Sequence, residues 1–174
     1  MQRIEEVMEY KYCPKCGGLL KQRLILPEDR PRLICKECDF IFYINPTPAV
    51  GVILLKNNKI VLVKRKYEPK RGQWSLPAGF LEYDETVEQT AIREAKEETN
   101  LNIRLNELFG VYSAFDDPRK QVLLVIYRGI ILDGEIKPGD DAEEVEYFSL
   151  DNLPEEIAFA SHRDVLNKVR QEIK

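Results

Sequence analysis

Apolar runs separated by polar turns predict several strands in this chain. Residues 49–55 and 60–63 form two such runs, and the Asn57-Asn58 pair between them predicts a hairpin turn, because Asn tolerates left-handed backbone conformations. Further strand-like runs cover residues 19–26, 32–35, 108–112, 121–132 and 145–148. None of the apolar runs approaches the ~20 residues needed to cross a bilayer, so we expect no membrane span.

Two stretches are predicted to be helical. Residues 86–99 contain no Gly or Pro, are rich in Glu, Ala, Lys and Arg, and have apolar positions at helical spacing. This helix is predicted to end at Asn100, since Asn replaces Gly readily at a helix C-terminus. Residues 163–173 predict a closing helix. Together the elements predict a mixed α/β domain with a sheet and at least two helices.

Length and composition narrow the class of protein. The 174 residues, 44% hydrophobic and 32% charged, fit one soluble globular domain with room for a small appendage. Residues 1–6 are polar and acidic and lack the layout of a secretory signal, which predicts a cytoplasmic protein in a reducing compartment. The single histidine and the absence of a Gly-rich nucleotide fingerprint exclude a three-histidine metal site and the common phosphate loops.

The four cysteines lie in two Cys-x-x-Cys pairs, Cys13 with Cys16 and Cys35 with Cys38. Four thiolates at this spacing, joined by a predicted hairpin, fit a tetrahedral Zn²⁺ site. Its closed ligand shell leaves no water position, so the metal should be structural and replace the core that so small a module cannot build. Disulfides are the alternative. We predict a zinc ribbon over residues 1–45 and the main domain over residues 46–174.

The predicted ribbon is slightly basic, whereas the rest of the chain is acidic. Residues 10–39 carry seven Lys and Arg against four Asp and Glu, and residues 40–174 carry eighteen against twenty-three. The cations available for phosphate are Lys15, Lys21, Arg23, Arg30, Arg32 and Lys36. An excess of three positive charges is small for a strong phosphate binder, so nucleic-acid binding by the ribbon is an alternative only.

Three glutamates of the first predicted helix share one face. Glu94, Glu97 and Glu98 stand at i, i+3 and i+4, so their carboxylates project one turn apart. Like charges at this spacing destabilise an isolated helix by about 0.2–0.5 kcal/mol a pair, and a hard cation such as Mg²⁺ or Mn²⁺ would compensate. An ion pair of Glu85 with Arg93 would fix the preceding loop against the helix. The alternative is an ordinary solvated helix face.

The loop before this helix completes a longer pattern. The stretch resembles the Nudix hydrolases, whose box reads Gly-x5-Glu-x7-Arg-Glu-U-x-Glu-Glu-x-Gly-U, with U apolar. The fixed positions are occupied by Gly79, Glu85, Arg93, Glu94, Glu97, Glu98 and Leu101, with Ala95 at the first U. Asn100 stands where the family has Gly, a change that should keep the turn. The resemblance implies an α/β (α+β) Nudix fold over residues 46–174, with a mixed sheet sandwiched by helices.

The resemblance also implies a reaction and roles for the residues. Nudix enzymes hydrolyse a nucleoside diphosphate linked to another moiety, by water attack on phosphorus. By motif position Glu94 and Glu98 bind Mg²⁺ or Mn²⁺, with the main-chain carbonyl of Ala78 as a third ligand. Glu97 would bind a second metal or activate water. Better-known members need a later carboxylate, and Glu144, before a strand with aromatic residues, is the candidate; a charged strand entrance is the alternative.

A zinc ribbon before a Nudix domain is similar to the NADH, FAD and ADP-ribose pyrophosphatases of this family. The NADH enzymes carry a Ser-Gln-Pro-Trp-Pro-Phe-type segment, and residues 113–119 of this chain differ from it. The Asp-Pro-Arg sequence within these residues is more similar to the ADP-ribose pyrophosphatases. Residues 158–161 resemble the tail of FAD-cleaving members. We therefore expect an adenosine-containing nucleoside diphosphate derivative that releases AMP. The candidates to stack on its base are Tyr67, Phe80, Phe115 and Phe159, for each of which core packing is the alternative.

Two other functions are compatible with these motifs. The chain could be a nucleic-acid-binding regulator that keeps the Nudix scaffold, or an enzyme that removes an NAD cap from RNA. Ribbon-bearing relatives are often homodimers, so a homodimer is the expected assembly. His162 is expected to decorate a helix start, and Trp74 to anchor its loop in the core.

Overall fold

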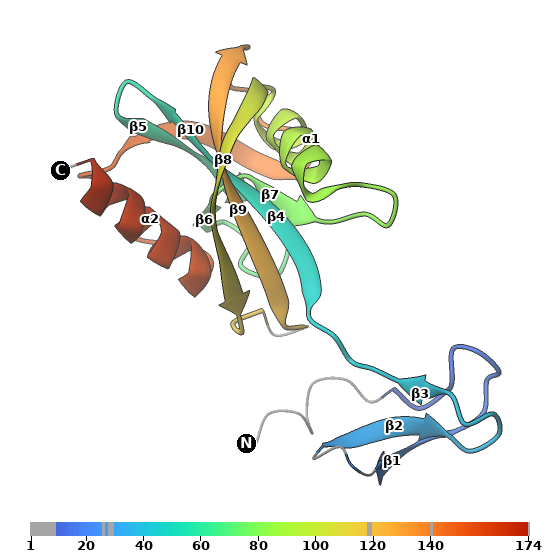
Figure 1. Ribbon diagram of the computed structural model, residues 1–174. Coiled ribbons are helices and arrows are strands. Elements are labelled where there is room, and N and C mark those ends of the chain that lie inside the picture. Colours follow the sequence, from blue (N-terminus) through green and yellow to red (C-terminus); the bar gives the residue numbers. More distant parts are fainter. Residues whose placement is uncertain (1–9, 26, 28–29, 118–119, 140, 174) are drawn as a thin grey trace. The chain divides into compact units, whose positions relative to one another are not determined.

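The computed structural model describes residues 10–25, 27, 30–117, 120–139 and 141–173 (Figure 1). The acidic start of the chain at residues 1–6, one residue of the predicted run 19–26 and residues 118–119 of the segment after the box lie outside this part. The chain divides into two compact units, Met1–Pro46 and Thr47–Lys174. No helix in the described part is long and apolar enough to span a membrane.

The smaller unit contains a three-stranded antiparallel sheet. The predicted hairpin is confirmed as β1 (Leu20–Leu24) and β2 (Pro31–Cys35), and β3 (Ile41–Phe42) pairs with β2. Two residues are too few for a periodic pattern, so the sequence does not predict β3. The unit has a small core, made of Cys13, Leu20 and Cys35 with Leu33, Cys38 and Phe42 packed against them. Such a core fits a module that depends on a bound metal.

The larger unit is built on a mixed sheet. The predicted hairpin is confirmed as β4 (Thr47–Lys56) and β5 (Lys59–Arg65), with Asn57 and Asn58 in the left-handed region at φ 53° and 61°. The other strands are β6 (Trp74–Ser75), β7 (Ala78–Phe80), β8 (Asn102–Ala114), β9 (Val122–Asp133) and β10 (Ala142–Ser149). The strand order is β10-β5-β4-β9-β8, with β6 on β5 and β7 on β4. The β4–β9 pair is parallel and the remaining pairs are antiparallel.

Helices cover both faces of this sheet, as Figure 1 shows for α1 (Val87–Thr99) and α2 (Ala160–Glu172). Because side chains alternate along a strand, β4 contributes side chains to two hydrophobic clusters, one on each face of the sheet. Its Ile53 belongs to the cluster that includes the apolar residues of α2, whereas Val52 and Leu54 belong to the cluster of α1. The predicted sandwich is therefore confirmed. The second helix begins three residues earlier than the predicted 163–173.

Trp74 packs against the cluster on the α2 side and lies edge-on to Phe148, with ring centroids 4.7 Å apart. Its predicted role as a core anchor is confirmed. The strand β8 begins at Asn102, well before the predicted run 108–112, because its first half alternates with exposed polar residues and offers no continuous apolar signal.

Candidate active site

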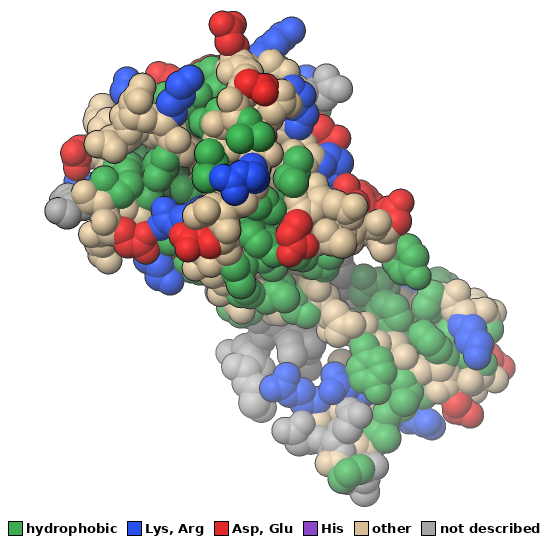
Figure 2. Space-filling model, turned by 45° about the horizontal axis from the view of Figure 1, so that its top comes forward, with side chains coloured by type: hydrophobic (Ala, Val, Ile, Leu, Met, Phe, Trp, Pro, Cys, Tyr) green, Lys and Arg blue, Asp and Glu red, His purple; other side chains and the backbone are tan. Residues whose placement is uncertain are grey.

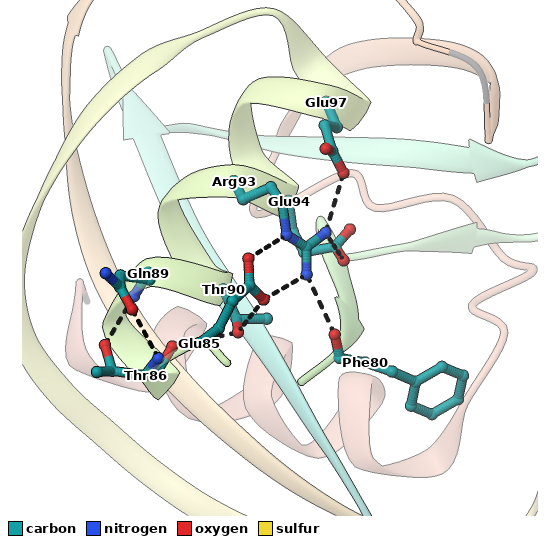
Figure 3. A network of polar contacts seen from close by, with 8 residues as sticks. All are labelled: Phe80, Glu85, Thr86, Gln89, Thr90, Arg93, Glu94 and Glu97. Atoms are coloured by element: carbon teal, nitrogen blue, oxygen red, sulfur yellow. Dashed lines mark hydrogen bonds and ion pairs between the residues drawn. The ribbon is translucent and has the colours of Figure 1, made fainter. Parts of the chain in front are cut away.

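The helix α1 is closed at both ends by its own sequence. Thr86 is the N-cap and forms a capping box with Gln89: Thr86 Oγ1 accepts from Gln89 N at 3.2 Å, and Gln89 Oε1 accepts from Thr86 N at 2.8 Å (Figure 3). Asn100 is the C-cap at φ 62°. The helix bounds therefore match the prediction, and they hold the glutamate face beside β7.

Arg93 organises the acidic residues of this region (Figure 3). Its Nε and Nη2 lie 2.6 and 2.8 Å from the two oxygens of Glu85, which confirms the predicted ion pair. Its Nη1 lies 2.6 Å from Glu94 Oε1 and 3.0 Å from Glu97 Oε2, and Nη2 donates to the carbonyl of Phe80 at 3.2 Å. The hydrogen bonds from Arg93 lower the pKa of Glu85 to about 2. One guanidinium thus joins the loop, the strand β7 and the helix.

Glu98 is buried, and Glu94 is largely buried, with 12% of its side chain exposed. Glu98 is 9% exposed, and its Oε2 accepts from Ala78 N at 2.9 Å. Burial raises the pKa of Glu98 to about 8, and it also raises the pKa of Glu94, against the opposing effect of Arg93. A Cβ at Gly79 would overlap the Glu94 carboxylate, so only glycine leaves room for it. The side chain of Glu97 is 58% exposed.

This arrangement fits a divalent cation. Glu94 and Glu98 lie one turn of helix apart and close to the backbone of β7, and burial disfavours the ionisation of both. A positive charge between the two carboxylates would therefore stabilise their charged forms. Their oxygen ligands suit Mg²⁺ or Mn²⁺ better than softer metals. The backbone N–H of Ala78 is engaged by Glu98, which keeps this residue of β7 next to the carboxylates.

A loop that follows β9 lies over the C-terminal end of α1. Lys137 N donates to Thr99 O at 3.0 Å, and a Cβ at Gly139 would overlap the carbonyl of Glu97. The loop leads to Asp141, whose negative charge contributes to the raised pKa values of both Glu94 and Glu98. Sequence reasoning missed Asp141; the glycine before an acidic run is the only local signal for it.

The structure places Glu144 elsewhere. Val145 and Tyr147 of β10 pack in the cluster of α1, and Phe148 packs in that of α2. Alternation therefore directs Glu144 to the α2 face, away from the glutamates of α1. Its Oε1 lies 2.8 Å from Lys64 Nζ on the neighbouring strand β5.

A cavity of about 100 Å³ adjoins Ala78 and Gly79. Two of the predicted aromatic candidates, Phe80 and Phe159, line it, with Lys120 Nζ 3.9 Å from the centroid of the Phe80 ring. The other two do not line it: Phe115 and Tyr67 are 61% and 54% exposed. The structure thus brings two of the four candidates together beside the glutamate helix.

His162 lies in the first turn of α2, as predicted, but it is buried and lines the same cavity. Its Nδ1 accepts a hydrogen bond from Leu76 N at 3.1 Å. Burial, followed by the positive charge of Arg65, lowers the pKa of His162 to about 4. The ring is therefore neutral near pH 7. Asp117, from the segment after the box, is also buried and lines the cavity.

The four cysteines of the smaller unit come together as predicted. Their Sγ atoms all lie within 4.8 Å of one another, and none of the four forms a disulfide. Sulfur atoms about 2.3 Å from a central zinc are on the order of 3.8 Å apart in a tetrahedron. The Sγ distances are 3.8 Å for Cys13 and Cys38, 3.4 Å for Cys16 and Cys35, and 3.3 Å for Cys16 and Cys38. The group fits a structural Zn²⁺.

Comparison with known families agrees with both units. A family model described as a NUDIX domain matches residues 45–169, and a model of the Nudix N-terminal zinc ribbon matches residues 11–44. The chain belongs to the Nudix hydrolase family. Nudix enzymes use a divalent metal, in keeping with the carboxylates of α1.

Named relatives and a solved structure extend the likeness. An ADP-ribose pyrophosphatase of Methanocaldococcus jannaschii is 45% identical over 129 residues, 74% of this chain and 76% of the relative. An NAD-capped RNA hydrolase NudC of Vibrio atlanticus is 31% identical over 83% of this chain, which spans only 51% of that protein. A crystal structure of a Nudix hydrolase from Nitrosomonas europaea superposes with a TM-score of 0.84 at 38% identity, covering 93% of this chain and 91% of that one.

The Nudix box of this chain departs from the family pattern at Asn100, and the structure accommodates the change. The residue adopts the left-handed conformation expected of the family's Gly, and its backbone N–H donates to Lys96 O. Its Nδ2 donates to the carbonyl of Glu135 at 3.0 Å, a contact that glycine cannot make. Asn100 therefore ends the helix and also holds the loop that leads to Asp141.

Proposed function

We propose that this Nudix hydrolase cleaves the pyrophosphate bond of an adenosine-containing nucleoside diphosphate derivative of the ADP-ribose type and releases AMP, with Mg²⁺ or Mn²⁺. One observation carries the proposal: the buried carboxylate of Glu98 and the largely buried carboxylate of Glu94 lie on one helix face, beside a cavity lined by aromatic side chains. The name of the Methanocaldococcus relative agrees with this class of substrate.

In the proposed reaction Glu94 and Glu98, with the main-chain carbonyl of Ala78, hold the cation. The cation supplies charge for the diphosphate oxygens and acidifies bound water. Glu97 is more exposed than the other two and is assigned to orient the attacking water or accept its proton. Arg93 restrains Glu94 and Glu97 and offsets part of their mutual repulsion. Arg93 and Glu85 therefore position the carboxylates that act.

The cavity takes the base of the substrate in this proposal. The rings of Phe80 and Phe159 offer faces for a flat heterocycle, and base stacking on an aromatic ring is worth about 1–3 kcal/mol. Lys120 over Phe80 and Arg65 over Phe159 place two cations at its margin, where a diphosphate would enter. The nucleotide is thereby directed toward the glutamates.

The test is AMP release from ADP-ribose, FAD, NADH and NAD-capped RNA with Mg²⁺. Glu97→Gln and Glu98→Gln should lower kcat by about 100-fold or more. Glu88→Gln, at an exposed position in the first turn of the same helix, is the matched control and should keep full activity. If folded, zinc-loaded protein releases AMP from none of these compounds, the proposal is wrong.

Removal of an NAD cap from RNA is a second candidate, favoured by the surface of the smaller unit. Arg23 of β1 stands directly opposite Arg32 of β2, an arrangement that is destabilising for like charges and that the ion pair of Arg23 with Asp39, at 4.0 Å, partly offsets. Contact with Lys21 lowers the pKa of Lys36. Figure 2 shows Lys and Arg side chains on this unit beside exposed hydrophobic ones, and the Arg32 guanidinium lies 5.2 Å from the ring centroid of Tyr43. A nucleic-acid strand would neutralise these cations and could stack on the tyrosine.

Salt dependence distinguishes this candidate from cleavage of free dinucleotides alone. The double variant Lys21→Gln, Arg23→Gln should reduce the slope of log binding constant against log salt for NAD-capped RNA by about two, without changing turnover of ADP-ribose. The control is Lys56→Gln with Lys59→Gln at the exposed β4–β5 hairpin. Equal slopes in the two double variants would exclude the ribbon as an RNA-binding surface.

A further inference from the structure

The cavity beside the glutamate helix is lined by Arg65, Ser75 and Asp117 and by two adjacent polar residues of α2 to which the proposed function gives no task. Most of its lining is apolar and comes from Ala49, Phe80, Ala114, Val122, Leu124 and Phe159. Ser161 and His162, adjacent residues in the first turn of α2, contribute polar side chains to it. Both residues are buried, at 4% and 5% exposed.

His162 presents a fixed hydrogen-bond donor. Its Nδ1 accepts from Leu76 N, so in the neutral ring the proton is on Nε2. No hydrogen bond joins Nε2 to another residue in the described part of the chain. Because the backbone of Leu76 holds the other side of the ring, Nε2–H cannot exchange donor for acceptor without breaking that bond. A ligand that contacts His162 in the cavity therefore meets an N–H group.

Ser161 supplies the second polar group. Its Oγ is buried and has no hydrogen-bond partner among the described residues. Buried polar atoms are paired in nearly all native proteins, and an exception calls for an explanation such as a ligand. Alanine would fill the same place on α2 without this unpaired hydroxyl, so packing alone gives no reason for serine.

We infer that Ser161 and His162 recognise an amide-like edge of the ligand, on which a hydrogen-bond acceptor stands next to an N–H donor. The acceptor would receive His162 Nε2–H, and the donor would bond to Ser161 Oγ. Adenine presents such an edge at its ring nitrogen and amino group, as does the carboxamide of nicotinamide. The inference rests on the proposed function, since the cavity adjoins Ala78 and Gly79 and its occupant would be linked to the diphosphate held by the glutamates.

The first experiment replaces each polar group separately. His162→Asn keeps an acceptor for Leu76 N–H but has no group at the position of Nε2, and Ser161→Ala removes the unpaired hydroxyl. Each should raise KM for the preferred substrate about 3- to 10-fold, the effect of one hydrogen bond, with little change in kcat. Ser161→Ala should leave Tm unchanged or higher. The control is Thr99→Val, whose hydroxyl is buried but donates to Ala95 O; it should lower Tm and leave KM unchanged.

The second experiment identifies the edge. Wild type should prefer ADP-ribose over its unsubstituted purine analogue, which lacks the amino donor, if adenine is bound, and the nicotinamide over the nicotinic acid dinucleotide if the carboxamide is bound. Ser161→Ala should abolish whichever preference is found. A wild type without either preference, or variants that keep it, would overturn the inference.

Binding separates this inference from the proposed function. Calorimetry with AMP, purine riboside monophosphate, nicotinamide mononucleotide and nicotinic acid mononucleotide needs no turnover. If wild type hydrolyses no substrate yet binds one amide-bearing ligand more tightly, and loses that preference in Ser161→Ala, only the proposed function fails. If substrates are hydrolysed but no ligand preference depends on Ser161 or His162, only the inference fails.

Discussion

The buried carboxyl group of Glu98 predicts a protein whose stability falls with rising pH when no divalent cation is bound in the Nudix unit. Its pKa is raised from 4.5 to about 8, mainly by burial. The folded protein therefore holds a proton that the unfolded chain releases above pH 4.5, so stability is lost as pH rises from 4.5 toward 8. At 1.36 kcal/mol per pKa unit, the loss at pH 7.5 is about 4 kcal/mol. Glu98→Gln removes this titration and keeps an oxygen for Ala78 N–H.

Urea unfolding of zinc-loaded protein in buffer without Mg²⁺ or Mn²⁺ measures this difference. The Glu98→Gln variant and wild type should be equally stable near pH 4.5, and the variant should be more stable by up to about 4 kcal/mol at pH 7.5. Addition of Mg²⁺ should stabilise wild type and leave the variant unchanged, since a cation that binds only the folded state shifts the equilibrium toward it. Glu97→Gln, at a mostly exposed side chain, should follow the wild-type pH profile. Parallel profiles of wild type and Glu98→Gln would refute the reasoning.

Three further predictions concern the box and the ribbon. Gly79→Ala should lower kcat by about 100-fold with an unchanged circular dichroism spectrum, because its Cβ would displace Glu94 and a small misplacement of a catalytic group is costly; wild-type kcat would contradict this. Arg93→Lys keeps the charge but loses the paired contacts to Glu85, so Tm by scanning fluorimetry and kcat should both fall, and an unchanged Tm would contradict the proposed positioning role. Cys35→Ser should unfold the ribbon while NMR signals of the larger unit persist; loss of all dispersed signals would contradict independent folding.

Features with a local physical cause could be predicted from the sequence. The left-handed Asn57-Asn58 turn, the end of α1 at Asn100 and the clustering of the four cysteines each depend on residues close in sequence or on a fixed ligand spacing. The ion pair of Arg93 with Glu85 could also be predicted, because residue 85 lies in a loop directly before the helix that contains residue 93.

Features that depend on packing between distant parts of the chain could not be predicted from the sequence. Asp141 acts on the pKa values of Glu94 and Glu98 because its loop crosses the end of α1. The glycine before the acidic run at residues 140–141 does not show which helix this loop will contact. Glu144 has the expected aromatic neighbours, yet its face is determined by the register of β10 on β5. The burial of His162 likewise results from the docking of α2 on the sheet.

The asparagine at the end of the glutamate helix also acts through the unfolded chain. Glycine at position 100 would sample many more backbone conformations before folding, and all of that freedom would be lost when the helix ends in the left-handed region. Asn100 has fewer conformations to lose, and its side-chain bond to Glu135 O adds a contact in the folded state. In this enzyme the helix end is therefore fixed at a smaller entropic cost than glycine at position 100 would require.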